Sequence, residues 1–582
     1  IAPFEINRIE KAVERCYSSL IVPPLTSAET IARQAANVVA AKYTQPTVEQ
    51  VQDIVEMALQ AAGEYEAAKS YILYRAEHSK LREYRPVPEE VRKAFEASNQ
   101  YFPTQLQKFQ FYDKYSRFNY DLGRRETWIE TVDRAVSYLR ELSHGKLSDE
   151  VYARLHDGIL NMRVMPSMRL LAMAGPAARR NNVAIYNCSY MSVDCIDSFV
   201  EALIISMSGC GVGYSVERQY VEKFPRIKRQ KSGEVKLHIV DDSSEGWAAA
   251  VRDGLTTWFN GDDIRFDYSE VRPAGAPLRT KGGRASGPEP LRVMLNFARK
   301  IILARQGSFL RPIDAHDIMC AIGEAAISGG VRRTAMISLF DFDDKEMLYC
   351  KSGDNLVGNE HRWNANNSAV WDRRYDQAEI TDLVLSMVKS GRGEPGIFNR
   401  VAAQKTRPAR RKNADFGTNP CGEIILRPNQ FCNLTSAICR SDDTFETLKE
   451  KVELAAILGT IQSMASHFPG LRKIWAENSR EERLLGVDLN GQLDSKAAQD
   501  PQIQAALRDL AVAVNKEYAE KLGIPQSASV TAVKPSGNSS TLVNSSSGIH
   551  ARWAPYYIRN VRVSAHSPLL KVMRDIGVPM NP

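Results

Sequence analysis

Short β-rich runs alternate with helical segments from residue 183 onward, and this alternation constrains the fold more than any other feature of the chain. Strands and helices that take turns along a sequence predict an α/β architecture. The pattern does not decide whether the sheet is open or closed into a barrel. The β-rich runs are 183–187, 335–340, 423–426, 529–533 and 561–564, and the helical segments include 198–208, 290–303 and 447–466.

The first 165 residues lack this alternation. Apolar residues recur at helical spacing up to a proline-punctuated linker at 85–88, which predicts a small helical domain over 1–84. Further helices over 89–165 lead into an α/β part over 166–582. The start at Ile1 and the end at Pro582, just after an apolar run, lead us to expect a fragment of a longer protein.

Composition excludes several classes of protein. Hydrophobic residues make up 43% and charged residues 25%, the balance of a globular chain, and no apolar run reaches the length of a membrane span. A net charge of +7 over 582 residues is too mild for a nucleic-acid binder. Nine cysteines, an odd number without zinc spacing, favour a reducing cytoplasmic compartment over a disulfide scaffold or a metal site.

Basic and glycine-rich stretches are the less specific features. The basic clusters at 226–231 and 405–412 are interpreted as solvated loops, with a phosphate-bearing ligand as the second interpretation. The glycines of 208–213 follow a helix, so they do not meet the context of a dinucleotide-binding fingerprint. Residues 272–290 predict either a ligand-ordered loop or a plain surface loop.

The segment 418–434 carries the chemistry. Asn419, Cys421 and Glu423 stand at alternate positions, so in an extended conformation an amide, a thiol and a carboxylate would project from one face. Cys432 follows Cys421 by 11 positions, which is enough for a hairpin to bring it back. A tight turn with a buried cysteine is the alternative on spacing alone.

The wording of this segment resembles the finger loop of ribonucleotide reductases, specifically the adenosylcobalamin-dependent (class II) ribonucleoside-triphosphate reductases. Further segments resemble that family in its order along the chain: 165–169, 186–189, 208–217, 285–288, 329–333 and 533–540. Residues 3–6 and 71–75 resemble an ATP-cone, a regulatory nucleotide-binding domain. The resemblance implies a ten-stranded α/β barrel, incomplete at its C-terminus, behind that cone.

The resemblance also implies residue roles. Cys421 would carry a thiyl radical formed with adenosylcobalamin, Glu423 would act as general base and Asn419 would hold the ribose hydroxyls. Cys188 and Cys432 would supply the reducing electrons and end as a disulfide. The implied substrates are ribonucleoside triphosphates, and a thioredoxin-like partner would restore the dithiol. ATP or dATP and deoxynucleoside triphosphates would be allosteric effectors.

Substrate and effector contacts are implied in the same way. The expected substrate contacts are Ser167, Ser189, Pro535, Ser536, Gly537, Asn538, Ser539 and Ser540. The expected allosteric residues are Arg272, Arg279, Lys281, Arg284, Ser328, Gly329, Gly330, Arg332 and Arg333. No metal ligand, nucleic-acid partner or membrane contact is expected.

Two alternatives stay open at this point. An iron-dependent class I large subunit that takes diphosphates is the main rival, and a non-catalytic nucleotide sensor is the second. The 11-residue gap favours class II, and an apparent insertion at 217–270 favours a monomer over a homodimer. The sequence around His316 lacks the glycine of a histidine-on cobalamin motif, so we expect base-on binding. The missing C-terminal cysteine pair leads us to expect no sustained turnover from this chain alone.

Overall fold

The computed structural model describes most of the chain, in two compact units that comprise residues 1–96 and 97–582. Described are residues 5–556, except 19, 21–22, 44–45, 47, 84–87, 232, 234, 277, 279–284 and 327–334, together with 558, 560–563, 570, 574 and 580. The domain boundaries at 84 and 165 remain predictions.

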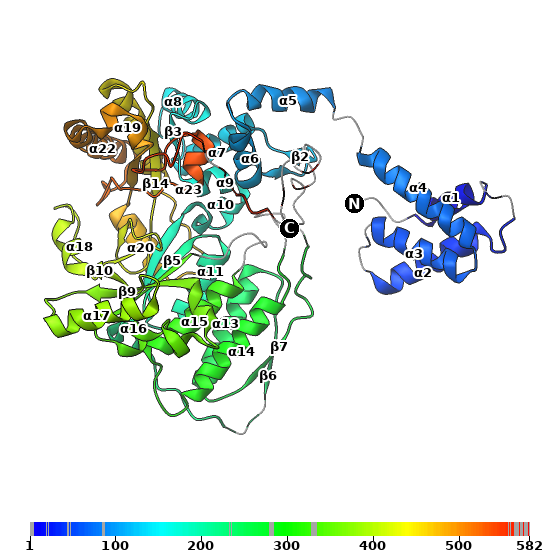
Figure 1. The fold of residues 1–582 in the computed structure, drawn as a ribbon, viewed down its shortest axis with the longest axis horizontal. Coiled ribbons are helices and arrows are strands. Elements are labelled where there is room, and N and C mark those ends of the chain that lie inside the picture. The colour runs from blue at the N-terminus through cyan, green and yellow to red at the C-terminus, as the bar shows by residue number, and fades with distance from the viewer. Residues whose placement is uncertain are drawn as a thin grey trace. The chain divides into compact units, whose positions relative to one another are not determined.

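The N-terminal unit is helical, as predicted (Figure 1). Its helices pack around a core that includes Val13, Ile31, Val55 and Leu59. Ser27 begins the second helix by accepting a hydrogen bond from the Thr30 N–H. The helices are α1 (Ile6–Tyr17), α2 (Ala28–Lys42), α3 (Val48–Ala61) and α4 (Tyr65–Glu83).

Helices and a short hairpin connect this unit to the α/β part. The elements are α5 (Glu89–Asn99), α6 (Gln105–Lys114), β1 (Phe118–Asn119), β2 (Arg124–Arg125), α7 (Trp128–Leu142), α8 (Asp149–Leu160), α9 (Met168–Met173), α10 (Pro176–Arg180) and the 3₁₀ helix η1 (Asn182–Ile185).

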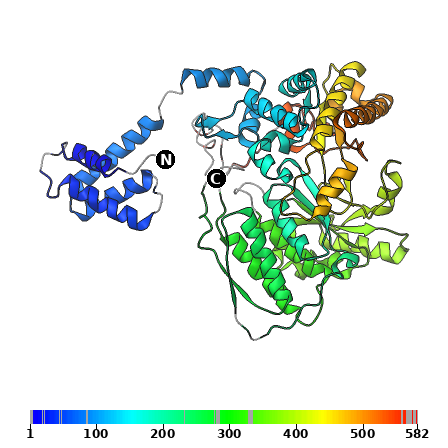
Figure 2. The same cartoon turned by 180° about the vertical axis from the view of Figure 1, so that it is seen from behind.

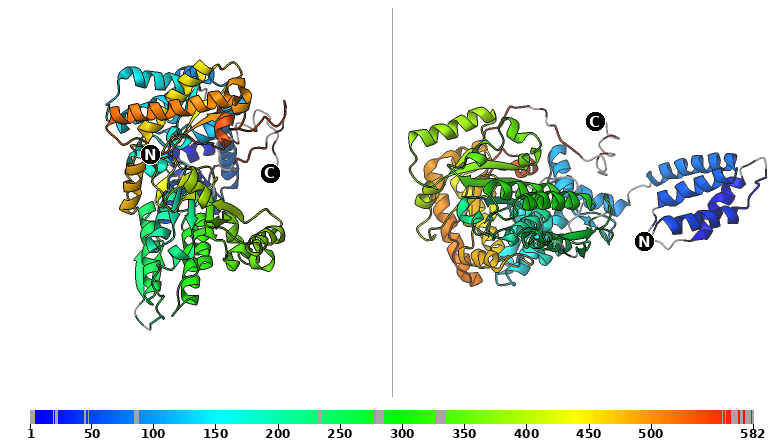
Figure 3. Two further views of the ribbon diagram at one scale, coloured as in Figure 1. Left: turned by 90° about the vertical axis from the view of Figure 1, so that its left-hand side faces the viewer. Right: turned by 90° about the horizontal axis from the view of Figure 1, so that it is seen from below.

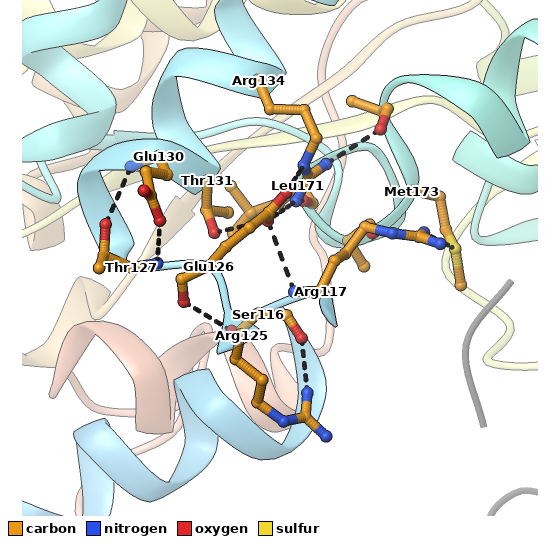
Figure 4. Close-up of polar contacts among 12 residues, drawn as sticks. Ser116, Arg117, Arg125, Glu126, Thr127, Glu130, Thr131, Arg134, Leu171 and Met173 are labelled. Carbon is orange, nitrogen blue, oxygen red and sulfur yellow. Dashed lines mark hydrogen bonds and ion pairs between the residues drawn. The ribbon is translucent and has the colours of Figure 1, made fainter. Parts of the chain in front are cut away.

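A polar network around the start of α7 fixes the position of α9 (Figure 4). Thr127 and Glu130 form a capping box at the first turn of α7. Arg134 pairs with Glu126 at 2.8 Å and also donates to the Leu171 carbonyl at 3.2 Å. The network therefore holds α9, the helix that Ser167 precedes.

The larger sheet contains six strands in the order β10-β9-β8-β5-β4-β13. Its first five strands are parallel and β13 is antiparallel to β4. The strands β4 and β5 are buried along their whole length, as expected for parallel strands covered on both faces. The strands are β4 (Cys188–Ser192), β5 (Gly211–Ser215), β8 (Met336–Asp341), β9 (Ala365–Trp371), β10 (Gly396–Asn399) and β13 (Gln430–Phe431).

Helices connect these strands, and Figure 3 shows α13 and α14 side by side. A separate parallel pair, β6 with β7, is joined through α13 within the expected insertion. The elements are α11 (Ile196–Met207), α12 (Arg218–Val221), β6 (Lys236–Ile239), α13 (Ser244–Phe259), β7 (Ile264–Asp267), α14 (Glu289–Ala304), α15 (Pro312–Ala325), α16 (Lys345–Tyr349), η2 (Gly353–Leu356), η3 (Glu360–Asn364), α17 (Gln377–Ser390) and α18 (Arg400–Thr406).

The smaller sheet has the order β15-β14-β3, with β14 parallel to β15 and antiparallel to β3. Figure 2 shows α19 lying beside α22, and α19 also packs on β14. The elements are β3 (Val164–Met165), β14 (Leu434–Ile438), α19 (Phe445–Gln462), α20 (Lys473–Glu482), β15 (Gly486–Asn490), η4 (Gln492–Asp494), α21 (Lys496–Gln499), α22 (Pro501–Leu522) and α23 (Gly537–Val543).

The α/β prediction is confirmed, while individual runs differ. Residues 183–187 were expected as a strand, but their first part belongs to the 3₁₀ helix η1, which the Asn181 side chain caps. The run 529–533 contributes only the bridge between Thr531 and Val487 among the described residues. Residues 561–563 form no strand, and 564 lies outside the described part. No described helix is long and apolar enough to cross a bilayer.

Candidate active site

A two-stranded hairpin carries the predicted finger loop. Its strands are β11 (Gly417–Thr418) and β12 (Ile425–Leu426), and we call residues 417–426 the finger hairpin. The Gly422 N–H donates to the Asn419 carbonyl at 2.9 Å, and Gly422 has a φ of +81°, a conformation that favours glycine. Residues 419–423 therefore form a turn, which is the alternative that the spacing left open, and not the extended conformation in which the three side chains would share one face.

The turn nevertheless brings Asn419 and Glu423 together. The Asn419 amide donates to a Glu423 carboxylate oxygen at 2.8 Å, and the Asn419 side-chain oxygen accepts from the Ile424 N–H at 3.1 Å. Asn419 is fully buried, so its side chain is locked by these contacts. Burial raises the pKa of Glu423, although Asn419 and the nearby Lys534 ammonium partly offset that shift.

Three cysteines meet beneath and at the tip of the hairpin. Cys188 begins β4 and Cys432 follows β13, and the antiparallel pairing of these strands joins them through two hydrogen bonds. The Cys432 N–H donates to the Cys188 carbonyl at 2.9 Å, and the Cys188 N–H donates to the Cys432 sulfur at 3.2 Å. Cys421 is the exposed member of the three.

The thiols influence one another's protonation. The contact with Cys188, together with burial and the charge of Glu423, raises the pKa of Cys421. The pKa of Cys188 is also raised well above its ordinary value, because the contact with Cys421, which lowers it, is outweighed by Cys432 and by burial. Both sulfurs therefore carry a proton at neutral pH, as a hydrogen-atom donor must.

The charge of the buried Lys534 acts on the carboxyl groups of both Glu423 and Asp488. Lys534 is 6% exposed and donates to the Ser436 hydroxyl at 3.3 Å. Asp488 lies beside Ser436 on the neighbouring strand, and burial raises its pKa to about 6. A cavity of about 150 Å³ reaches Glu423 and Ile424. The sequence interpretation missed Lys534 and Asp488, because no local pattern in a single sequence shows that residues of distant segments lie close together.

All of the expected substrate contacts belong to the described residues. The hydroxyls of Ser167 and Ser189 are buried and donate to the carbonyls of Ile185 and Gly211, both at 2.9 Å. Ser536 precedes α23, and the Ser540 hydroxyl donates to the Ser536 carbonyl at 2.8 Å. Pro535 and Gly537 are exposed, Asn538 is half-buried and Ser539 is buried.

The expected effector residues are described only in part. Arg272 pairs with Asp242 at 2.8 Å. The other predicted positions lie outside the described residues: Arg279, Lys281, Arg284, Ser328, Gly329, Gly330, Arg332 and Arg333. His316 is fully buried and bonded to the Tyr214 hydroxyl at 2.9 Å, which does not suit a cobalt ligand.

Most basic residues of the cluster 405–412 are exposed, as expected of a solvated loop, but one residue differs. Arg411, placed in a solvated loop by its basic neighbours, is buried and paired with Glu482 at 2.9 Å. Its charge is satisfied by a residue 71 positions away, and the local run of basic residues could not reveal that partner.

Comparisons with known proteins bear on this site. The family description "ATP cone domain" matches residues 1–80, and "Ribonucleotide reductase alpha domain" matches residues 89–175. A solved B12-dependent (class II) ribonucleotide reductase superposes with a TM-score of 0.65 at 24% identity, covering 76% of this chain and 74% of that one. The chain has the fold of a class II ribonucleotide reductase.

Curated proteins with similar sequences carry the name of the same class of reductase. The adenosylcobalamin-dependent ribonucleoside-triphosphate reductase of Lactobacillus helveticus is 27% identical, over 80% of this chain and 76% of that protein. The adenosylcobalamin-dependent ribonucleoside-triphosphate reductase of Euglena gracilis is also 27% identical, over 79% of this chain and 66% of that protein. The predicted resemblance to class II ribonucleotide reductases, with an ATP cone in front, is confirmed.

Proposed function

We propose that this protein reduces ribonucleoside triphosphates to 2′-deoxyribonucleoside triphosphates with adenosylcobalamin as cofactor. The observation that carries the proposal is the convergence of Cys421, Cys188 and Cys432 with the Asn419–Glu423 pair at one hairpin. The curated relatives bear this activity in their names.

The residues divide the reaction between them. Cys421, as a thiyl radical, takes the hydrogen from C3′ of the ribose. Glu423 accepts the 3′-hydroxyl proton, for which its carboxylate must be ionised, and Asn419 orients the hydroxyls. The 2′-hydroxyl leaves as water after protonation by the Cys188–Cys432 dithiol, whose two electrons reduce the sugar and leave a disulfide. Cys421 then returns its hydrogen to C3′.

The exposed thiol of Cys421 fits a cofactor that approaches from outside, because Cys188 and Cys432 are buried beneath it. Cys421 is the residue that would meet adenosylcobalamin, which when bound would supply the radical chemistry that activates this thiol. We further propose base-on cobalamin binding, since His316 is engaged in the core.

Further parts of the proposal concern regulation and partners. The ATP cone would bind ATP or dATP, and deoxynucleoside triphosphates would act at the loops near Arg272 and 328–333. A thioredoxin-like dithiol would reduce the disulfide, in a monomeric enzyme of the reducing cytoplasm. The substrate phosphates would lie at Pro535 to Ser540, and Ser167 and Ser189 would line the same site.

The test is direct. The chain is incubated with adenosylcobalamin, each ribonucleoside triphosphate and dithiothreitol, and products are separated by chromatography, with Cys421→Ser as the matched control. Deoxynucleoside triphosphate that depends on Cys421 and adenosylcobalamin supports the proposal. Product formed only with an iron-containing second subunit and diphosphate substrate would favour the class I alternative, and nucleotide binding without product would favour a sensor.

A further inference from the structure

The finger hairpin is too short to hold itself in place. Its ladder has two rungs, Gly417 with Leu426 and Thr418 with Ile425, and an isolated two-stranded hairpin is marginally stable even when longer. Yet its tip must keep the Cys421 sulfur beside Cys188. Contacts from outside the hairpin must therefore supply the rigidity.

A first buried ion pair binds the residue that precedes β11. The Arg400 guanidinium, at the start of α18, makes two bonds of 2.7 Å to the Glu217 carboxylate and donates to the Phe416 carbonyl at 2.8 Å. Glu217 follows β5 and also accepts from the Ser215 hydroxyl at 2.6 Å. The pair thus ties one leg of the hairpin to the larger sheet.

A second buried ion pair binds the backbone of β12. The Arg411 guanidinium binds the Glu482 carboxylate at 2.9 Å and donates to the Ile425 carbonyl at 2.9 Å. Gln430 joins this pair, donating to Glu482 at 2.7 Å. Since Gln430 lies on β13 two residues before Cys432, the pair connects the hairpin to the strand that carries the expected reducing dithiol.

The two pairs are linked to each other. The Arg411 guanidinium stacks over the Phe416 ring at 4.7 Å, and the carbonyl of Phe416 is the group that Arg400 holds. All four charged side chains are nearly fully buried. A buried ion pair adds little stability compared with apolar residues of the same size, so stability alone does not account for two of them at one hairpin.

We propose that the Arg400–Glu217 and Arg411–Glu482 pairs are positioning residues that fix the finger hairpin so that Cys421 lies against Cys188. Their hydrogen bonds go to one another, to neighbouring polar side chains and to the backbone around the hairpin and not to a thiol, although Arg411 also lines the cavity that reaches Glu423. Their importance for turnover rests on the proposed function, but their control of the Cys421 position does not.

The test replaces one pair by apolar residues in the full chain. In the double variant Arg411→Met with Glu482→Met no buried charge is left unpaired, while the Ile425 carbonyl loses its donor. Arg411→Lys is the second variant, since it keeps the charge but not the forked geometry. The matched control is Arg362→Met with Asp317→Leu, which removes a buried pair that binds the Cys350 carbonyl and also contacts His361, away from the hairpin.

The readout is alkylation of each cysteine by iodoacetamide at pH 8, quantified by peptide mass spectrometry, with the melting temperature measured alongside. When Cys421 is released from Cys188, the pKa of the Cys421 thiol falls toward its ordinary value. Each pKa unit by which it falls increases the fraction of reactive Cys421 thiolate about tenfold. We expect Cys421 alkylation to rise about tenfold in the double variant, about threefold in Arg411→Lys, and less than twofold in the control.

A turnover measurement accompanies the alkylation, with dithiothreitol as the reductant because the chain alone is not expected to turn over repeatedly. We expect kcat to fall about 100-fold in the double variant, with KM for the nucleotide within about threefold. Cys421 alkylation that matches the control in both Arg411 variants would overturn the positioning role. If the unmodified chain forms no product while the alkylation changes as expected, the proposed function fails and the positioning role stands.

Discussion

The close approach of the finger hairpin to β5 gives the sharpest prediction. Gly213 lies beneath Thr418, and a Cβ atom placed on Gly213 would lie 2.1 Å from the Thr418 carbonyl oxygen. Contacts under 3.0 Å are not tolerated, so Gly213→Ala must separate hairpin and strand by about 0.9 Å. The clash is between a Cβ atom and a backbone oxygen, so no side-chain rotation can relieve it.

The magnitude follows from this displacement. A shift of about 1 Å at a reacting group can cost about 100-fold in rate, and we expect that loss in kcat. Overpacking of this kind also lowers the free energy of unfolding by about 1–3 kcal/mol, which leaves the protein folded. KM should change little, because the expected phosphate contacts at 535–540 lie on another segment.

The matched control lies two residues away on the same strand. A Cβ on Gly211 would meet the Pro420 side chain at 3.2 Å and the Cys188 sulfur at 3.4 Å, so a movement of a few tenths of an ångström suffices. Gly211→Ala should therefore lose less than about tenfold in kcat. Initial rates of deoxynucleotide formation decide the matter, and a Gly213→Ala protein with near-normal kcat, or equal losses in both variants, would refute the reasoning.

Three further predictions concern the thiols and the buried carboxyls. Cys421→Ser should abolish product formation, and Cys432→Ser should block productive reduction because one sulfur of the dithiol is lost. Nucleotide affinity, measured by equilibrium dialysis, should change less than about twofold in both variants. Product formation at a normal rate in either variant would contradict these roles. Burial raises the pKa of Glu423 above its ordinary value of 4.5, so kcat should fall as pH drops through that raised pKa. Lys534→Met removes a charge that lowers the same pKa and should move this acid limb to higher pH, and a pH–rate profile that does not move would exclude the coupling. Burial raises the pKa of Asp488 from an ordinary 3.8 to about 6, so its contribution to stability is complete below about pH 4 and lost as pH rises through 6. Asp488→Asn should therefore add up to about 3 kcal/mol to the free energy of unfolding at pH 8 and almost nothing at pH 4. Equal effects at both pH values in urea unfolding would count against this.

The fold class and the site segment could be predicted from the sequence, but the geometry of the site could not. The alternate spacing of Asn419 and Glu423 suggested one shared face, and the structure joins the two side chains through a turn instead. Cys188 and Cys432 are 244 residues apart, and their contact depends on the pairing of β13 with β4. Only the family resemblance pointed to that pair, because strand order is set by long-range packing that no local pattern records.

The glycine-rich run 208–213 shows why such packing matters for function. The run does not fit a dinucleotide-binding fingerprint, because it follows the helix α11 and leads into the strand β5. In the structure, Gly211 and Gly213 share the face of β5 that meets the finger hairpin, whereas Val212 and Tyr214 lie on the opposite face, fully buried in the core. On the neighbouring strand, the ring of Tyr190 lies directly against Gly417, where a Cβ would fall 2.0 Å from the ring. Two glycines beneath the hairpin and one within it thus remove the side chains that would hold the backbones apart. The close contact that they allow is what brings the Cys421 tip within reach of Cys188.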